Sequence, residues 1–171
     1  HYADYLSNIF SDDAAFCEVI RHWAAEEVQH GQALGRWAAV ADPTYDLDAR
    51  YARFRKGYSL NIGVTESARG SRAGELVARC MVETGTSSYY TAMADKTDEP
   101  VLKEICRRIA ADELRHYKLF YTHLQRYLES EPLSKLGRLK VALGRIAESE
   151  DDELAYAYFA ANAGEDATYE R

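Results

Sequence analysis

Two Glu-x-x-His motifs, Glu27-x-x-His30 and Glu113-x-x-His116, constrain the fold of this chain more than any other feature. Each lies in a long segment whose apolar residues recur every three or four positions, which is the period of an amphipathic α-helix. At this spacing the carboxylate and the imidazole project from the same helix face about one turn apart, so both can bind one metal ion. Two such helices that face each other can hold two ions.

The two motifs belong to an internal repeat with a constant offset of 86 residues. The same offset relates Arg21 to Arg107, and it relates the Ala-Ala pair at 24–25 to the pair at 110–111. The motifs therefore do not stand alone in unrelated surroundings. The repeat predicts a duplicated helical hairpin.

Composition favours one domain that spans residues 1–171. The chain is 47% hydrophobic and contains three prolines, which suits a single helical core. A net charge of −7 argues against nucleic-acid binding, since a nucleic-acid backbone requires a basic surface. No apolar run approaches the roughly 20 residues that a membrane span requires. We therefore expect that the protein does not bind nucleic acid and contains no membrane-spanning segment.

The cysteines and the first residue bear on the compartment. Cys17, Cys80 and Cys106 are widely spaced, with no Cys-x-x-Cys pair, so they indicate neither a disulfide framework nor a rubredoxin-type iron site. This favours a reducing compartment, and the cytoplasm is the default expectation. Because the chain opens with His1 rather than an initiator Met, we expect missing upstream residues, which leaves a targeting segment open.

The predicted fold class is all-α: a four-helix bundle of two duplicated hairpins with a long crossover, followed by a C-terminal fifth helix. Its predicted parts are a first hairpin over 1–42, a crossover over 43–70 with some short helix, a second hairpin over 71–129 and an extra helix over 132–163. The long helices are expected over about 14–40, 71–95 and 99–129, and the fifth over about 133–162.

A two-metal site in such a bundle takes one Glu from each of two helices and a Glu-x-x-His from each of the other two. The third helix offers Glu83, which shares a stripe with Leu76 and Cys80. The repeat offset puts the equivalent first-helix Glu four residues upstream of His1, and we expect it there. For Glu27 and Glu113 the alternative is a buried ion pair with an Arg across the bundle. Three carboxylates and two imidazoles at one level are, however, costly to bury without cations.

The segments Trp23-Ala-Ala-Glu-Glu-Val-Gln-His-Gly31 and Ile109-Ala-Ala-Asp-Glu-Leu-Arg-His116 resemble the metal-binding helices of ferritin-like diiron carboxylate proteins. Within that superfamily they are most similar to the soluble acyl-[acyl carrier protein] desaturases, over roughly residues 1–129. The resemblance implies a ferritin-like bundle and two iron ions, or an iron and manganese mixture. It implies that the ions are bound by the upstream Glu and by Glu27, His30, Glu83, Glu113 and His116.

The resemblance also implies an activity and three further site residues. In the desaturases the two ferrous ions donate electrons to O₂, and hydrogens are removed from an acyl chain. Glu26 and Asp112 look like the carboxylates that orient a ligand imidazole of the opposite repeat, and the alternative is ordinary solvent-facing acids. Thr86 matches a hydroxyl residue beside the oxygen-binding face, and the alternative is a helix threonine bonded to its own backbone.

The implied partners are a small-molecule or acyl-carrier-bound substrate, an external ferredoxin-like electron donor and a second copy in a homodimer. The chain is shorter than the desaturases, which leaves the substrate open. An acidic carrier would need a basic patch, and the alternative is that such clusters are solvated faces. The candidate residues for this patch are Arg50, Arg53, Arg55, Lys56, Lys135, Arg138 and Lys140.

Two other functional classes remain. A ferroxidase or peroxide-reducing protein, as among ferritins and rubrerythrins, would use the same ligands without an organic substrate. A non-catalytic helical interaction protein would keep the bundle and bind no metal. Cys80 and Cys106 lie on the ligand stripes, and we expect them to be core residues rather than redox groups.

Overall fold

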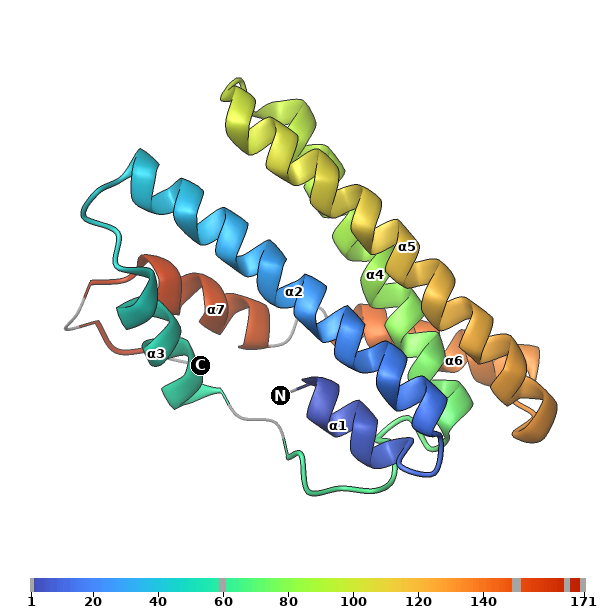
Figure 1. Ribbon diagram of the computed structural model, residues 1–171. Coiled ribbons are helices and arrows are strands. Elements are labelled where there is room, and N and C mark those ends of the chain that lie inside the picture. The colour runs from blue at the N-terminus through green and yellow to red at the C-terminus, as the bar shows by residue number, and fades with distance from the viewer. Residues whose placement is uncertain (1, 59–60, 149–151, 165–166, 170–171) are drawn as a thin grey trace.

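The computed structural model describes residues 2–58, 61–148, 152–164 and 167–169, and across these it contains helices and no strands (Figure 1). The helices are α1 (Tyr2–Ile9), α2 (Ala14–Ala41), α3 (Leu47–Gly57), α4 (Arg72–Lys96), α5 (Pro100–Ser130), α6 (Lys135–Glu148) and α7 (Asp152–Asn162). The all-α fold class is confirmed, and the architecture is consistent with a ferritin-like bundle. The three long predicted helices begin and end within about one residue of the observed ones.

Polar side chains define where the longer helices begin. Asp13, Asp46 and Ser71 each accept a hydrogen bond from a backbone N–H in the first turn of α2, α3 and α4. Glu99 does the same for α5, where Pro100 occupies the first turn and needs no N–H partner. These caps satisfy donors that a helix leaves unpaired at its start.

The long helices form one bundle (Figure 1). α4 and α5 lie side by side along their length, α2 runs beside α5, and α1 packs on α2. The buried apolar core lies where α1, the start of α2, the start of α4 and the end of α5 meet. Its members are Tyr5, Leu6, Ile9, Phe10, Phe16, Ile20, Trp23, Ala73, Leu76, Val77, Cys80, Phe120, Leu124 and Tyr127.

The prediction of one C-terminal helix over 133–162 is wrong, because the structure has two helices there. α6 packs against α4, whereas α7 packs against α3 (Figure 1). Val141 and Ala142 of α6 contact the core, and Tyr156 of α7 donates a hydrogen bond to the Arg53 carbonyl at 3.0 Å. The two segments bury their faces against helices on different sides of the bundle, and one straight helix cannot reach both.

The basic residues considered above as a patch for an acidic carrier do not form a single patch. Arg53 donates hydrogen bonds to the Ala163 carbonyl at 2.7 Å and to the Gly164 carbonyl at 3.0 Å, and Arg50 also donates to Ala163. These guanidinium groups therefore bind the carbonyls that follow α7. Lys135, Arg138 and Lys140 lie on α6, far from α3 (Figure 1). Among the described helices, none has the length and hydropathy needed to cross a membrane.

Candidate metal centre

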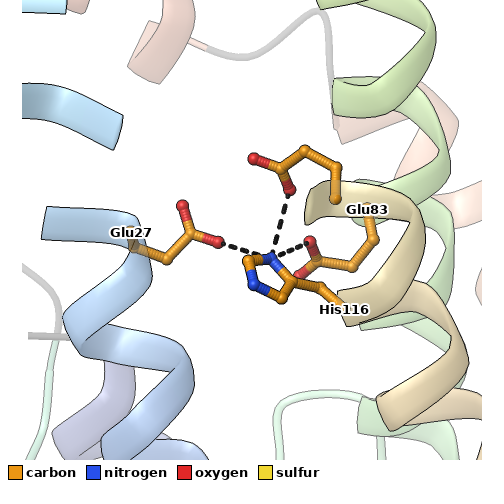
Figure 2. A group of neighbouring side chains, drawn as sticks. Glu27, Glu83 and His116 are labelled. Atoms are coloured by element: carbon orange, nitrogen blue, oxygen red, sulfur yellow. Dashed lines mark ion pairs between the residues drawn. The ribbon is translucent and has the colours of Figure 1, made fainter. Parts of the chain in front are cut away.

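Four predicted ligands meet in the middle of the bundle. Glu27 of α2, Glu83 of α4, and Glu113 and His116 of α5 offer ligand atoms that all lie within 4.8 Å of one another. Figure 2 shows Glu27 and Glu83 pointing toward the His116 ring from separate helices. Glu83, Glu113 and His116 are almost completely buried, and the Glu27 side chain is one-third exposed.

His30, the fifth predicted ligand, lies beside this group. Its Nδ1 atom is 3.7 Å from Glu27 Oε2 and 3.4 Å from Glu113 Oε1. Its ring centroid is 5.8 Å from that of His116, whose Nδ1 lies 3.2 Å from Glu27 Oε1. Each imidazole thus turns Nδ1 toward the shared carboxylates. The structure brings all five residues together.

The other ring nitrogen of each imidazole is bound by an acid of the opposite repeat. His30 Nε2 lies 3.0 Å from Asp112 Oδ2, and His116 Nε2 lies 2.7 Å from Glu26 Oε2. Arg115 forms ion pairs with both acids, at 3.3 Å to Glu26. An Nε2–H that donates to a carboxylate leaves the lone pair on Nδ1, which is the atom that faces the centre.

Buried atoms without hydrogen-bond partners make the site compatible with a cation. Five buried side-chain nitrogen or oxygen atoms in the described residues lack a partner, and three of them are His30 Nδ1, His116 Nδ1 and Glu83 Oε2. All three face the same space. Leaving a buried polar atom without a hydrogen bond is costly, and a bound cation would satisfy all three atoms. Carboxylate oxygens and imidazole nitrogens are donors that iron and manganese accept.

The electrostatics of the candidate ligands are also compatible with bound cations. Burial lowers the pKa of both imidazoles, but the surrounding carboxylates outweigh it and raise the pKa of His30 to about 10 and that of His116 to about 12. Burial raises the pKa of Glu27 and Glu113, but their contacts with the two imidazoles hold it below its usual range. Without metal, protons on the imidazoles therefore offset the carboxylate charge. Metal cations would take over this role and displace those protons.

We did not predict two further charged residues that lie on the buried face of α4. Glu75 and Arg79 are 1% and 8% exposed, and Arg79 forms an ion pair with Glu83. The spacing Glu75-x-x-x-Arg79-x-x-x-Glu83 puts all three on one helix face. A charged residue on the apolar stripe, one turn before a candidate ligand, was the signal in the sequence that could have identified Arg79.

Thr86 has a local hydrogen-bond partner. Its hydroxyl donates to the Val82 carbonyl at 2.9 Å, which is the bond of a helix threonine to its own backbone. Its role beside the centre therefore stays a prediction. Cys80 and Cys106 are both buried, as expected for core residues.

Comparisons with known proteins agree with this architecture. The family model described as "Fatty acid desaturase" matches residues 3–147. The chain is 28% identical over 120 residues to "Putative acyl-[acyl-carrier-protein] desaturase DesA2" of Mycobacterium tuberculosis, covering 67% of this chain and 41% of the relative. It is 32% identical over 112 residues to "Palmitoyl-[acyl-carrier-protein] 4-desaturase 2, chloroplastic" of Ophrys sphegodes, covering 64% of this chain and 29% of the relative.

The chain therefore spans less than half the length of these curated relatives. No solved structure gives a significant match. The family model, in contrast, covers most of the chain, including the region of the two Glu-x-x-His motifs. The chain belongs to the fatty acid desaturase family.

Proposed function

We propose that this chain binds two iron ions and that the protein containing it is an oxidoreductase that desaturates an acyl chain. The observation that supports this best is the set of buried atoms on His30, His116 and Glu83 that have no hydrogen-bond partner and face one space. Glu27 and Glu113 supply the remaining carboxylates, and an upstream Glu is expected to complete the set. Membership of the desaturase family favours iron and an organic substrate.

When bound, the two iron ions supply the electrons and the O₂ activation that removal of hydrogens from an acyl chain requires. The residues of this chain hold the ions and set their surroundings. Glu26 and Asp112 keep a proton on Nε2 of each imidazole, so that Nδ1 is free to bind metal. Near-complete burial of Glu83, Glu113 and His116 keeps bulk water from most of the ligand set.

The substrate and partners follow from the relatives rather than from the centre. Both relatives described above are named as desaturases of acyl chains on acyl carrier protein. We propose a substrate of that class, an external electron donor such as a ferredoxin, and a homodimer. Sedimentation of the purified protein measures the oligomeric state, and a monomer would contradict the last proposal.

The metal content of the protein tests the proposal directly. We expect about two iron or manganese ions per chain in protein isolated without chelators, and loss of both in Glu113→Ala. Glu129→Ala, which removes an exposed acid of the same helix, should keep both ions. A folded wild-type chain that contains no metal and takes up no ferrous iron would overturn the proposal and indicate a non-catalytic helical protein.

A ferroxidase or peroxide-reducing protein would use the same ligands. Such a protein would oxidise ferrous iron and release it without any acyl substrate, and a ferritin would also assemble into a large shell. Iron that stays bound through repeated oxidation and reduction would support the desaturase instead. The family match favours this second outcome.

A further inference from the structure

We propose that Arg79 is a positioning residue that fixes the carboxylate of Glu83, so that its Oε2 atom faces the candidate metal centre. The inference rests on the proposed function, because it requires a centre that binds metal. It concerns a residue outside the ligand set, one turn before Glu83 on α4.

The two oxygens of Glu83 have different surroundings. Oε1 accepts a hydrogen bond from Nη2 of Arg79. Oε2 has no hydrogen-bond partner and lies 3.7 Å from His116 Nδ1. The Glu83 side chain is 1% exposed and that of Arg79 is 10% exposed, so water does not compete for the pair. Arg79 therefore determines which oxygen turns toward the centre.

Three aromatic rings hold the Arg79 guanidinium group in place. Its Cζ atom lies 4.8 Å from the ring centroid of Tyr2, 4.9 Å from that of Trp23 and 5.3 Å from that of Phe120. Cation–π attraction at such distances is strongest where water is excluded, as it is here. The rings come from α1, α2 and α5, so the guanidinium is enclosed by three helices besides its own.

Glu75 in turn fixes one of these rings. The Tyr2 hydroxyl donates to Glu75 Oε1 at 2.5 Å, and the Tyr5 and Ser67 hydroxyls donate to Glu75 Oε2 at 3.1 and 2.6 Å. Glu75 is 1% exposed. A continuous series of contacts thus runs from Ser67 through Glu75, Tyr2 and Arg79 to the candidate ligand.

The chemistry of arginine explains why this arrangement acts on a metal ligand. A hydrogen bond from a charged guanidinium to Oε1 is strong and directional, so it fixes the orientation of the Glu83 carboxylate. Arg79 stays protonated, since guanidinium does not lose its proton in proteins. Its planar group also stacks on rings and donates in a fixed direction. Lysine offers neither property, although it carries the same charge.

Titration of the full chain with Co²⁺ tests the proposal, because the visible absorption of Co²⁺ reports its coordination. In Arg79→Lys and Arg79→Gln we expect one of the two ions to bind about 10–100-fold more weakly and its absorption to change. The control is Arg108→Lys, since Arg108 and Glu104 form an exposed pair on α5 with the same four-residue spacing. Variants of Arg79 that bind both ions with wild-type affinity and spectrum would overturn the proposal.

Two comparisons distinguish a failure of this inference from a loss of folding and from a failure of the proposed function. Arg79→Lys keeps the charge and most of the volume, and its circular dichroism spectrum should be that of a helical protein. If Arg79→Gln does not fold, the Co²⁺ titration of Arg79→Lys alone tests the inference. A wild-type chain that binds no Co²⁺ contradicts the proposed function and this inference together. A wild-type chain that binds two ions, with Arg79 variants that behave identically, contradicts this inference alone.

Discussion

Each imidazole of the centre lies between carboxylates on its two sides. Glu27 and Glu113 lie near Nδ1 of both rings, while Glu26 and Asp112, the residues just before them, bind Nε2 of the ring from the opposite repeat. Adjacent residues on a helix point about 100° apart, so one acid can reach the centre while its neighbour reaches across to the other helix. The duplication produces both contacts by the same geometry.

Replacing Glu26 with alanine should weaken metal binding about 10–100-fold while the fold is kept, because His116 loses the acceptor that orients its ring. Isothermal titration with Mn²⁺ measures the affinity. Glu104→Ala is the matched control, since Glu104 is an exposed glutamate that pairs with Arg108 on α5. Equal affinities for Glu26→Ala and the control would mean that Glu26 is an ordinary surface acid.

At the scale of the elements, Asp13 joins the start of α2 to the end of α5. Its Oδ1 atom accepts from the Phe16 backbone N–H at 3.0 Å, and its Oδ2 atom accepts from the Tyr127 hydroxyl at 2.8 Å and from Arg126. The Asp13 side chain is 12% exposed. A cap residue therefore also fixes how two helices of the bundle meet, next to Phe10 and Phe16 of the core.

Asp13→Ala should lower the free energy of unfolding by about 0.5–2 kcal/mol at neutral pH, the usual cost of losing an N-cap. Urea unfolding followed by circular dichroism measures it. Asp12→Ala is the control, because the Asp12 side chain is 72% exposed and pairs with Arg72 at 2.7 Å, so its loss should cost less than about 1 kcal/mol.

The stability that Asp13 contributes should depend on pH in a definite direction. Burial raises the pKa of Asp13, but hydrogen bonds from Phe16, Arg126 and Tyr127 outweigh it and hold the pKa below the usual 3.8. The carboxylate therefore contributes stability that is fully present above pH 3.8 and is lost as the pH falls through the lower pKa of the folded state. The difference in the free energy of unfolding between wild type and Asp13→Ala should therefore become smaller in acid. A difference that becomes larger in acid would contradict a stabilising role for the ionised Asp13 carboxylate.

At the scale of the whole molecule, the apolar core and the candidate metal centre lie at different positions along the bundle. The core occupies the end where α1, the start of α2 and the end of α5 meet. Farther along, α2 and α5 face each other through the charged side chains of the centre, with a hydrogen bond from Trp37 Nε1 to Glu99 Oε2 at 2.7 Å beyond it. Metal ions there would link α2 to α4 and α5 beyond that core.

Bound metal should therefore stabilise the entire protein. At a free Mn²⁺ concentration 100 times its dissociation constant, one site contributes about 2.7 kcal/mol if the unfolded chain does not bind. Thermal unfolding with Mn²⁺ and with a chelator measures this, and the melting temperature should rise with Mn²⁺. In Glu113→Ala the rise should disappear. A wild-type melting temperature that is unaffected by Mn²⁺ would argue against a centre that joins the helices.

The sequence by itself determined where the long helices lie and which candidate ligands share a helix face. Both are local properties: apolar periodicity and capping residues such as Asp13 and Ser71 act over one or two turns. The repeat offset then related one Glu-x-x-His to the other, and the spacing along α4 singled out Glu83. For this reason the boundaries of the three long helices and the convergence of these side chains were predictable without coordinates.

Only the tertiary structure decided what each helix face meets. It placed Arg79 among three rings from other helices and divided the C-terminal segment between α4 and α3. These outcomes depend on contacts between residues far apart in the sequence, such as Arg79 with Tyr2 or Arg53 with Tyr156. Helical periodicity gives the direction of a side chain, but packing between helices chooses its partner.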